Sequence, residues 1–518
     1  MKKVTVMSAD EAAKFVQDGQ TVVTSGFVGS GCPESLTKAL ENRFINTGAP
    51  KDLTLFYAAA QGNRDGSGAE HFAHVGMTKR VIAGHWNMAP RLGKLVIDNQ
   101  IEGYNLPQGT LSQLLRDIAA HKVGTITHVG LNTFVDPRNQ GGKLNEITKE
   151  DIVELINING QERLLYKSMP IDIAFIRGSY ADELGNVTVH REVAPTEVTS
   201  MAQAVKNSGG KVFVQVERMV KAGSLDPRLV KIPRIYVDGI IIAKPDDHEQ
   251  CFGHSFDPSL TGEVQVPLDT ISIPPLSTKK IIGRRAAMEL KEDVVVNLGI
   301  GIPEYISMVA NEEGIGDYMT LTVEAGPIGG VPAGGSQFGA SINPECILEQ
   351  HMQFDFYDGG GVDQAFLGLA EADSHGNINV SKFGPRLAGC GGFINITQNA
   401  KSVHFCGTFT AGGLETTIKD GKLIIEKEGK YKKFIKDVEH ITFSGDYARK
   451  VNQPVMYITE RAVFELRQDG LYLTEIAPGI DLKTQVLDLM DFMPKMDGQP
   501  KIMAEAIFRD EVMGIANK

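Results

Sequence analysis

One glutamate stands out among the residues that could take part in covalent chemistry. Glu324 follows a β-rich run at 319–323 and precedes a stretch of mostly small residues at 325–330. A carboxylate at a strand end beside glycines can be approached closely by a reacting carbonyl group, as nucleophilic catalysis by a carboxylate requires. A solvated turn residue or an ion-pair partner is the ordinary alternative for a glutamate at such a position. An internal repeat of the chain favours the chemical interpretation.

The repeat is visible in two pairs of segments. Residues 171–189 align with 362–380 without a gap, and both segments contain Asp-x-Ala-Phe, then Ala-Asp, then Gly-Asn. The hexapeptide GSGCPE at 29–34 likewise aligns with GIGIPE at 299–304. Matching segments in the same order indicate a duplicated scaffold.

The two copies differ at the position of the suspected nucleophile. Between the matching segments, residues 53–59 align with 319–325, so that Ala58 corresponds to Glu324. Duplicated scaffolds often bind a ligand where their halves meet, and a charge present in only one half indicates asymmetric chemistry. We therefore predict that Glu324 is the catalytic residue.

A cluster of small residues, GCGGF at 389–393, could stabilise developing negative charge. Consecutive glycine N–H groups can converge on an oxyanion and lower the free energy of a transition state in a dry site. Bulges and close helix packing are the alternative reasons for a glycine pair. Cys390 could itself be a nucleophile, but a cysteine between glycines is more often a small buried residue, and no histidine is adjacent to it in sequence.

Glycine loops after predicted strands offer further anion-binding sites. Residues 299–301 follow an apparent strand at 292–298, and a second glycine-rich turn lies at 408–413. A loop between a strand and a helix presents free N–H groups and the positive end of a helix dipole, which suit phosphate or carboxylate. A tight turn without a ligand is the other interpretation. The GxGxP pattern differs from GxGxxG, so dinucleotide binding is disfavoured.

Two more segments could reach the same site. GHW at 84–86 contains the only tryptophan, and PQGT at 107–110 is predicted to open a helix. A core tryptophan and a surface glutamine are the alternatives for these positions.

Length and composition limit the class of protein. With 518 residues, the chain exceeds the size of one ordinary core, so two large domains are expected. A hydrophobic content of 42% and a charged content of 22% are typical of soluble globular proteins. The net charge of -12, without a dense run of Lys and Arg, argues against a nucleic-acid partner.

The cysteines and the hydropathy pattern predict a reducing compartment and no membrane insertion. The five cysteines are widely spaced and include no CxxC pair. This pattern argues against a disulfide framework and a structural zinc site, and we expect no metal. The apolar run near residue 16 is too short for a signal peptide, and no stretch approaches the roughly 18 apolar residues of a spanning helix. We therefore expect a cytoplasmic protein without a membrane partner.

The order of predicted elements indicates an α/β fold. Strand, glycine loop and helix follow one another at 20–40 and again at 292–309. Short continuous apolar runs at 173–176, 212–216 and 235–242 predict strands that are buried on both faces. Together with the repeat, they predict two related open α/β domains that arose by internal duplication.

The domain limits follow from composition. Residues 255–278 contain several prolines and lack a helical period, so we place a linker at 266–278. The predicted N-terminal α/β domain is then 1–265, and the C-terminal α/β domain, which carries Glu324, is 279–518. The matching segments are farther apart in the first half, where additional residues are expected around 63–150.

These motifs resemble the signatures of the coenzyme A transferases that work through a glutamyl thioester. Residues 18–33 follow the first signature of that family, with Ser25 where a glycine is usual. The second signature normally reads SENG, whereas this chain reads VEAG at 323–326. The departure is typical of the single-chain branch, whose ExGxxG pattern is met at 324–329. GxGGF is met at 389–393, and the similarity covers nearly the whole chain.

The resemblance implies roles for individual residues. Glu324 would attack an acyl-CoA and become a thioester with coenzyme A, while the N–H groups of Gly391 and Gly392 would hold the tetrahedral oxygens. The other implied residues match family positions that line the pocket or contact coenzyme A: Gln108, Asn297, Gly299, Gly301 and Gly412.

The resemblance also implies substrates and assembly. Coenzyme A would be a co-substrate with no other bound cofactor, and the partners would be acyl-CoA and small carboxylates of the acetate and propionate type. Members of this family are usually homo-oligomers, and we expect a tetramer.

Two rival functions stay open at this level. An acyl-CoA hydrolase could use the same scaffold and the same glutamate to trap water. A nucleotide-binding or regulatory module could keep the scaffold without turnover. Glu324 argues against the regulatory module, because a copy without activity could tolerate alanine there, as at Ala58.

Overall fold

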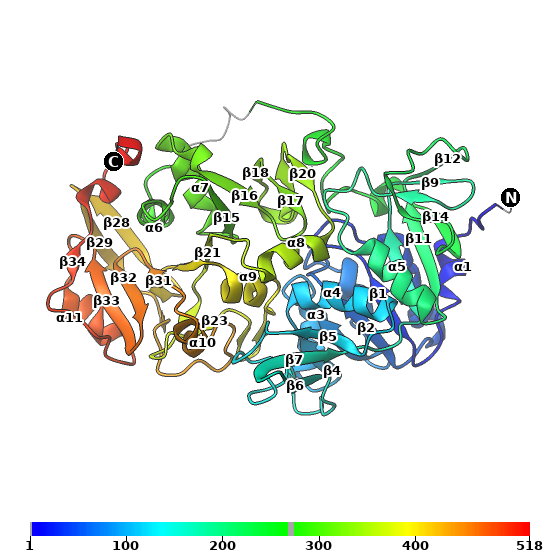
Figure 1. The fold of residues 1–518 in the computed structure, drawn as a ribbon, viewed down its shortest axis with the longest axis horizontal. Helices are drawn as coiled ribbons and strands as arrows, with labels where there is room; N and C mark the ends of the chain where they lie inside the picture. Colours follow the sequence, from blue (N-terminus) through cyan, green and yellow to red (C-terminus); the bar gives the residue numbers. More distant parts are fainter. Residues whose placement is uncertain (1–2, 268–273, 518) are drawn as a thin grey trace. The chain divides into compact units, whose positions relative to one another are not determined.

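Buried apolar strands alternate with helices along the chain, as the sequence predicts. The computed structural model describes residues 3–267 and 274–517, and its elements are shown in Figure 1. Its helices are α1 (Ala9–Ala13), α2 (Glu34–Thr47), α3 (Pro90–Ile97), α4 (Gln108–Ala119), α5 (Val198–Asn207), α6 (Thr278–Ala287), α7 (Glu304–Glu312), α8 (Gln350–Asp358), α9 (Phe393–Asn399), α10 (Gly445–Lys450) and α11 (Leu482–Gln485).

The described residues group into two compact units. Unit 1 takes in the described part of Met1–Val266 together with Val323–Asp355 and Lys382–Asn395. Unit 2 takes in the described part of Pro267–Thr322 together with Phe356–Ser381 and Ile396–Lys518. Glu324 and the GCGGF motif therefore group with unit 1. The linker predicted at 266–278 lies partly outside the described residues, so the limits 1–265 and 279–518 stay predictions.

A parallel sheet forms the centre of unit 1. Its strand order is β14-β11-β8-β1-β2-β3-β4, and neighbouring strands run parallel. The strands are β1 (Thr21–Thr24), β2 (Leu53–Tyr57), β3 (Thr78–Ala83), β4 (Glu102–Asn105), β8 (Ile173–Arg177), β11 (Lys211–Val216) and β14 (Gly239–Ile242). Every residue of β8 is buried, as expected for a strand that is covered on both faces.

The strand predicted at 235–242 is shorter than expected. It begins only at Gly239, because the Tyr236 N–H donates to the Pro233 carbonyl, 3.0 Å, and closes a turn before it. Asp238 then accepts the Val212 N–H through its side chain, 2.9 Å, at the start of β11. Local turn hydrogen bonds therefore override the β propensity of the preceding apolar residues.

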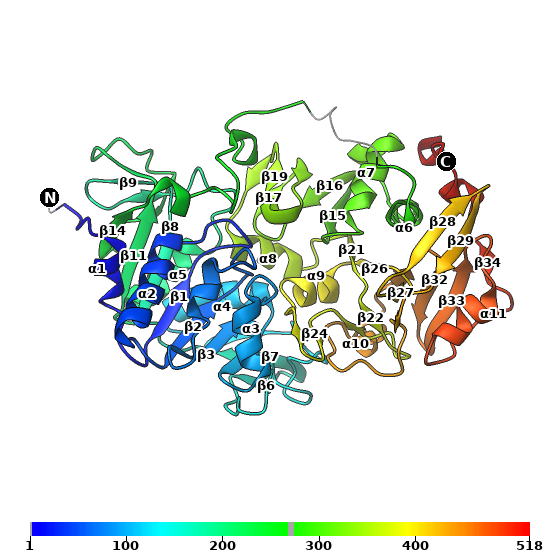
Figure 2. The same cartoon turned by 180° about the vertical axis from the view of Figure 1, so that it is seen from behind.

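The order in which successive strands join this parallel sheet reverses in its middle. Strands β1 to β4 follow one another toward one edge, and β8, β11 and β14 toward the other. Because parallel crossovers are right-handed, the reversal places helices on opposite faces. Helices α4 and α5 cover the face seen in Figure 1, and α1 and α2 cover the face seen in Figure 2. Ligands usually bind at the carboxyl ends of strands beside such a reversal, and the glycine loop at 26–33 follows β1 there.

Further strands of unit 1 lie outside its central sheet. They comprise β5 (Gly124–Thr127), β6 (Val153–Ile158), β7 (Gln161–Lys167), β9 (Tyr180–Asp182), β10 (Val187–Thr188), β12 (Arg218–Val220), β13 (Val230–Ile232), β17 (Pro327–Ile328), β18 (Val331–Pro332), β19 (Ser341–Ile342), β20 (Cys346–Ile347), β24 (Lys382–Phe383) and β25 (Arg386–Leu387). The first-half insertion predicted around 63–150 contains β3, α3, β4, α4 and β5.

Unit 2 has a sheet of the same kind. Its order is β16-β15-β21-β26-β31-β32-β33-β34, parallel from β16 to β31. The strands are β15 (Val294–Leu298), β16 (Met319–Thr322), β21 (Gln364–Gly368), β26 (Ser402–Cys406), β31 (Val455–Ile458), β32 (Ala462–Arg467), β33 (Gly470–Ile476) and β34 (Lys501–Ile502). Unit 2 also contains short strands that pair in separate two-stranded sheets: β22 (Glu371–Ala372), β23 (Ile378–Asn379), β27 (Thr410–Ala411), β28 (Glu415–Lys419), β29 (Lys422–Lys427) and β30 (Tyr431–Lys432).

The sequence repeat is matched by the same hydrogen bonds in each unit. The Thr21 N–H donates to Oδ2 of Asp172, 2.8 Å, and the Val295 N–H donates to Oδ2 of Asp363, 2.8 Å. A turn in which an aspartate accepts from both the backbone and the side-chain amide of an asparagine occurs at Asp182 with Asn186 and at Asp373 with Asn377. The repeated residues thus define one scaffold that is built twice.

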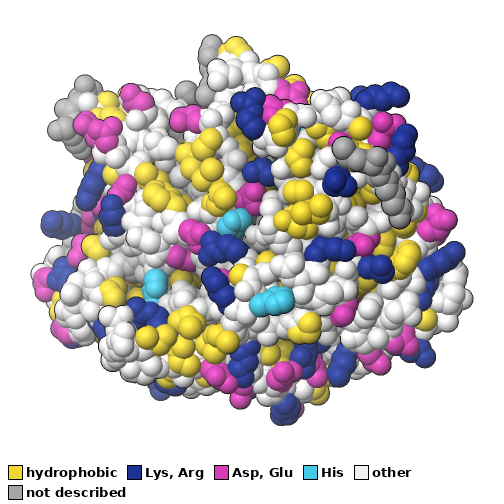
Figure 3. Space-filling model, turned by 45° about the vertical axis from the view of Figure 1, so that its right-hand side comes forward, with side chains coloured by type: hydrophobic (Ala, Val, Ile, Leu, Met, Phe, Trp, Pro, Cys, Tyr) yellow, Lys and Arg dark blue, Asp and Glu magenta, His cyan; other side chains and the backbone are white. Residues whose placement is uncertain are grey.

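Surface charge agrees with the composition. On the face drawn in Figure 3, Lys and Arg side chains are mixed with Asp and Glu, and apolar side chains form small groups between them. Within residues 3–267 and 274–517, no helix has the length and apolar character needed to cross a membrane.

The C-terminal segment is fixed to helices α6 and α7. Arg284 is fully buried and donates to the carbonyl groups of Arg509 and Glu511. The carboxylate of Glu313 accepts the Gly514 N–H at 2.8 Å. A buried guanidinium needs such acceptors, because an unpaired buried charge is costly.

We expect Arg284→Met to lower the free energy of unfolding by about 3 kcal/mol, because several carbonyl groups lose a charged donor. Urea denaturation of the purified variant measures this change. Arg467→Met is the matched control, since the Arg467 side chain is 38% exposed and its loss should cost little. Equal stability of the two variants would contradict the prediction.

Candidate active site

Glu324 lies in a tight turn that follows β16. The Gly326 N–H donates to the Val323 carbonyl, 2.9 Å, and the Val323 N–H donates to the Pro327 carbonyl, 2.9 Å. Gly326 has a φ of +134°, which residues with a Cβ rarely adopt. A Cβ at this position would also overlap the Leu348 carbonyl oxygen. The sequence therefore makes a tight turn with one carboxylate at its tip, between the buried residues Val323 and Ala325.

The Glu324 carboxyl group lies directly against the GCGGF motif. A Cβ on Gly392 would overlap Oε2 of Glu324, and it would lie 3.0 Å from Cζ of Phe354. The ring of Phe354 is fully buried and also fills the space beside Gly109 on α4. Only a glycine at 392 leaves room for the carboxyl group in this position.

Burial and one amide set the ionisation of this carboxyl group. Burial raises the pKa of Glu324 to about 7, and the side chain of Gln108 opposes that rise only in part. Gln108 is 1% exposed, and its Nε2 has no well-aligned acceptor within the described ranges. Glu324 as a whole residue is half-buried, and burial of its carboxyl group among protein atoms is the main cause of the raised pKa. Such a group is a candidate for chemistry.

The two predicted oxyanion donors differ. The Gly391 N–H donates to the Gly84 carbonyl, 2.7 Å, and the Gln108 N–H donates to the Gly391 carbonyl, 3.0 Å. The N–H of Gly391 is thus already used in this structure. Among the residues that the structure describes, the Gly392 N–H has no hydrogen-bond acceptor. Of the two predicted donors, Gly392 is therefore the one that can meet a developing oxyanion.

Gly84 was singled out from the sequence only as part of the GHW segment, and Asn105 was not singled out, although both hold the site together. A Cβ on Gly84 would overlap the Ala58 carbonyl oxygen and lie 3.2 Å from Cα of Gln108. Asn105 donates to the Gly84 carbonyl, 2.6 Å, and accepts the Cys390 N–H, 2.9 Å. A buried amide at the carboxyl end of β4 was the only sequence signal for Asn105, and the close backbone approach at Gly84 had none.

The Cys390 side chain is a buried filler in this arrangement. Its thiol is directed to the carbonyl oxygens of Leu106 and Gly84. Burial raises the pKa of Cys390 well above its usual range, so the reactive thiolate does not form near neutral pH. The alternative of a thiol nucleophile is thereby disfavoured.

His85 borders the glycine motif as a neutral ring. Burial, with a contribution from Arg64, lowers the pKa of His85 to about 4. Its Cδ2 would lie 3.4 Å from a Cβ on Gly391. The tryptophan that follows, Trp86, is fully buried, which agrees with the core interpretation of that residue.

Other predicted binding residues lie in unit 2. Asn297 donates to the Thr322 carbonyl, 3.1 Å, and to the Tyr357 hydroxyl, 3.3 Å. Gly299 packs on Leu367, at 3.0 Å from a Cβ placed there. A Cβ on Gly301 would meet open space, and Gly412 packs on Tyr431. The roles of Asn297, Gly299, Gly301 and Gly412 toward substrate stay predictions. No cluster of His, Cys, Asp and Glu that could hold a metal ion occurs in residues 3–267 and 274–517.

The fold and this site define a class of protein. An open α/β scaffold that presents a half-buried carboxyl group with a raised pKa beside a free backbone N–H suits acyl transfer through a covalent carboxylate intermediate. A family model described as coenzyme A transferase matches residues 6–243.

Sequence and structure comparisons agree with that match. The chain is 44% identical over 514 residues to acetate CoA-transferase YdiF of Escherichia coli K12, covering 99% of this chain and 96% of the relative. It is 45% identical over 517 residues to caffeate CoA-transferase of Acetobacterium woodii, covering 98% of each. The crystal structure of the acyl-CoA transferase YdiF of Escherichia coli O157:H7, in a thioester complex with CoA, superposes with a TM-score of 0.94 at 44% identity over 99% of this chain and 97% of that chain. The chain belongs to the coenzyme A transferase family.

We expect Gly392→Ala to lower the rate of CoA exchange between an acyl-CoA and a free carboxylate by about a hundred-fold, because a methyl group would displace the Glu324 carboxyl group by roughly an ångström. Steady-state exchange assays measure the loss, and circular dichroism should report an unchanged fold. Gly368→Ala is the control, since a Cβ there has no atom within 4 Å. A Gly392→Ala enzyme with full activity would contradict the geometry.

The pH dependence of the reaction should report the ionisation of Glu324. Because only the carboxylate can attack, kcat/KM should rise as the pH increases through about 7 and then level off. Gln108→Ala removes the interaction that lowers the pKa, so its midpoint should move to higher pH. The exposed substitution Gln468→Ala should leave the midpoint unchanged. A midpoint that falls in Gln108→Ala would refute this assignment.

Proposed function

We propose that this enzyme transfers coenzyme A between short-chain acyl-CoA thioesters and free carboxylates through a thioester on Glu324. The observation that carries the proposal is the carboxyl group of Glu324, which is half-buried, has a pKa raised to about 7, and lies against Gly392. The names of the acetate and caffeate CoA-transferases, and the thioester complex with CoA of a relative, support the same chemistry.

The reaction needs no proton transfer in its central steps. The Glu324 carboxylate attacks the acyl carbonyl carbon, the C–S bond breaks, and CoA leaves as a thiolate with a mixed anhydride left on Glu324. The thiolate then attacks the glutamyl carbonyl carbon, which releases the first carboxylate and forms the glutamyl thioester. An incoming carboxylate reverses both steps and departs as the new acyl-CoA. A thiolate is a good leaving group near neutral pH, so a positioned carboxylate suffices as nucleophile.

The neighbouring residues have distinct proposed tasks. The Gly392 N–H stabilises the tetrahedral oxygen, since it has no other acceptor in the described part of the chain. The Gln108 amide orients the carboxyl group. Asn297, Gly299, Gly301 and Gly412 contact substrate or coenzyme A, as their match to the family pattern suggests. Coenzyme A is the co-substrate and no further cofactor takes part.

The short-chain specificity rests on the resemblance to the propionate CoA-transferase branch. Acetate and propionate are the proposed carboxylates, in the metabolism of short-chain fatty acids during fermentation, and the active form is a homo-oligomer, with a tetramer favoured. The rival activity, hydrolysis of acyl-CoA, differs in one product: with propionyl-CoA and acetate, a transferase forms acetyl-CoA, whereas a hydrolase releases free thiol at a rate that does not depend on acetate.

We expect Glu324→Ala to reduce exchange by several powers of ten, because no other described group can carry the covalent intermediate. The exchange rate is measured by chromatography of the acetyl-CoA formed from propionyl-CoA and acetate. Cys390→Ser serves as the control and should retain most of its activity, since burial keeps that thiol protonated. Retention of more than about a tenth of the exchange rate in Glu324→Ala would remove this residue from its role.

A further inference from the structure

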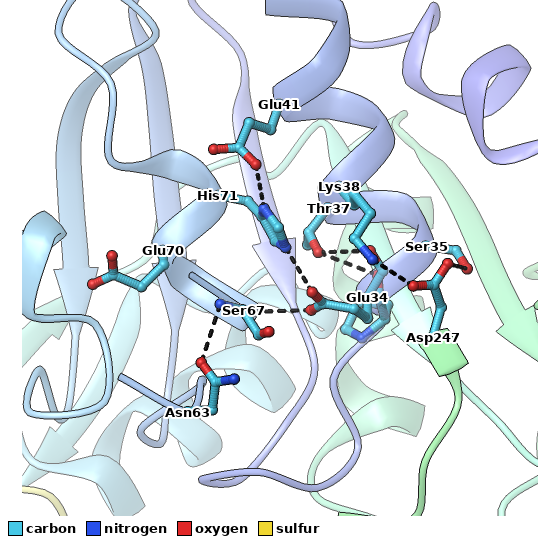
Figure 4. A network of polar contacts seen from close by, with 12 residues as sticks. Glu34, Ser35, Thr37, Lys38, Glu41, Asn63, Ser67, Glu70, His71 and Asp247 are labelled. Atoms are coloured by element: carbon cyan, nitrogen blue, oxygen red, sulfur yellow. Dashed lines mark hydrogen bonds and ion pairs between the residues drawn. The ribbon is translucent and has the colours of Figure 1, made fainter. Parts of the chain in front are cut away.

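A histidine that the proposed reaction does not use is held between two carboxylates. His71 belongs to the short helix η1 (Gly68–Phe72). Its Nε2 lies 2.7 Å from Oε1 of Glu34, and its Nδ1 lies 2.5 Å from Oε2 of Glu41. Figure 4 shows the ring pointing between these two side chains of α2. The second oxygen of Glu41 meets Nε2 of His74, 2.6 Å.

Two carboxylate partners require a proton on each ring nitrogen, so His71 is a cation. Burial opposes the charged form, but the hydrogen bonds and charges of Glu34 and Glu41 outweigh it and raise the pKa of His71 to about 9. Burial alone would raise the pKa of Glu41, but the hydrogen bonds from His71 and His74 outweigh burial and lower this pKa to about 2. The remaining charged groups close to the ring are already paired: Lys38 with Asp247, and Glu70 with Arg91.

The Glu34 carboxylate passes this constraint to the chain before η1. Its second oxygen accepts the Gly68 N–H, 3.0 Å. Gly68 in turn packs on Gly62, whose Cα would lie 2.8 Å from a Cβ on Gly68, and the Ala69 N–H donates to the Gln61 carbonyl, 3.3 Å. The clamp on His71 thus fixes both ends of the loop that runs from Gly62 to Gly68.

Residues 58–62, here called the 58–62 segment, are joined at the same place to the first glycine loop. The Gly62 N–H donates to the Val28 carbonyl, 2.8 Å, and the Val28 N–H donates to the Ala60 carbonyl, 2.5 Å. The Gln61 amide adds two hydrogen bonds to Thr24 at the end of β1. Two sets of contacts therefore hold the segment: those with Thr24 and Val28, and those that lead through Gly68 and Ala69 back to Glu34 and His71.

The 58–62 segment covers the turn that carries Glu324. Ala59 and Ala60 belong to one apolar cluster with Val323 and Ala325, the two neighbours of Glu324 in the chain. The segment supplies small, dry surface on this side of the turn, and a covalent thioester survives only where water is kept out.

We infer that His71 is a positioning residue for the reaction at Glu324: as a cation shared by Glu34 and Glu41, it fixes the 58–62 segment against the 323–326 turn and so protects the glutamyl thioester from water. The inference rests on the proposed function, because it requires a thioester at Glu324. His71 touches no reacting atom and acts through Glu34 and Gly68.

The first test measures how the covalent intermediate divides between transfer and hydrolysis. Wild type and His71→Gln are given propionyl-CoA and acetate, and acetyl-CoA and free thiol are quantified together. We expect the ratio of free thiol to acetyl-CoA to rise by about ten-fold in His71→Gln as water gains access, with little change in KM for acyl-CoA. A merely destabilised enzyme would lose both products in proportion. An unchanged ratio would overturn the inference.

His121→Gln is the matched control, because this exposed histidine makes one hydrogen bond, to the Asn207 carbonyl, 3.0 Å. Its product ratio should equal that of wild type. An equal rise in His121→Gln would also overturn the inference, since the effect would then not depend on the clamp.

A second variant covers the case in which His71→Gln does not fold. Glu41→Gln keeps the bond between His71 and Glu34 but removes one charge, so the pKa of His71 should fall. A raised pKa means that the cation, and its contribution to stability, is present at low pH and is lost as the pH rises through about 9. The ratio of free thiol to acetyl-CoA should therefore begin to rise at lower pH in Glu41→Gln than in wild type. Identical pH profiles would refute the inference.

The two proposals fail differently. If wild type forms no acetyl-CoA in the presence of acetate, the proposed function is wrong. If wild type transfers CoA normally while His71→Gln and Glu41→Gln keep its product ratio at every pH, only the role of His71 is wrong.

Discussion

The site depends on one conflict between burial and charge. The Glu324 carboxyl group is surrounded by protein to the point that its pKa rises to about 7, yet the proposed chemistry needs it ionised. A poorly solvated carboxylate is costly to form and correspondingly ready to react. Of the described neighbours, the one that favours the ionised form is the neutral amide of Gln108, which lowers the pKa of Glu324 only in part. A lysine or arginine partner would have stabilised the ionised group and lowered its pKa.

Close backbone approach makes this placement possible. Gly392 leaves room for the carboxyl group, and Gly84 lets the chain at Ala58 pass beside α4. Asn105 and the Gly391 N–H then fix these crossing segments with hydrogen bonds. The site is consequently made of backbone and small residues, which hold a geometry without long side chains that would need ordering.

The duplicated scaffold fits the proposal that one half carries the chemistry and the other supports it. Ala58 and Glu324 occupy equivalent places in the repeat, and the shared aspartate and asparagine contacts show that both copies keep the same framework. In the first copy, the residues after β2 pack beside the turn of the second copy that carries the nucleophile. Loss of the charge at 58 thus leaves an apolar surface where a second carboxylate would repel the first.

Much of this could be predicted from the sequence. The repeat led to Glu324, whose catalytic role stays a prediction, and continuous apolar runs predicted the buried parallel strands. The helix opening at Gln108 followed from the proline before it, and the family match then confirmed the α/β fold class. The predicted start of β14 at residue 235 was wrong, because hydrogen bonds close a turn at 233–237 and strand propensity does not describe such turn geometry.

Other features could not be predicted, since they depend on contacts between distant segments. The sequence placed Gly84 in a segment that could reach the site but did not show that its backbone matters, because that importance arises only when Ala58 and Gln108 lie on either side of it. The same holds for Gly391 and Gly392, which look equivalent in GCGGF but differ in the structure: one N–H is used by the Gly84 carbonyl and the other is free among the described residues. The pairing of His71 with Glu34 and Glu41 likewise joins two elements that no local pattern connects.

The central claim is that Glu324 becomes covalently linked to coenzyme A during turnover. The most direct measurement is to incubate the enzyme with acyl-CoA in the absence of an acceptor carboxylate, reduce it with borohydride, digest it and locate the altered residue by mass spectrometry. The account predicts one modified peptide, the one that contains Glu324, and none in Glu324→Ala. A modification on any other peptide, or full exchange activity without a modified peptide, would contradict it.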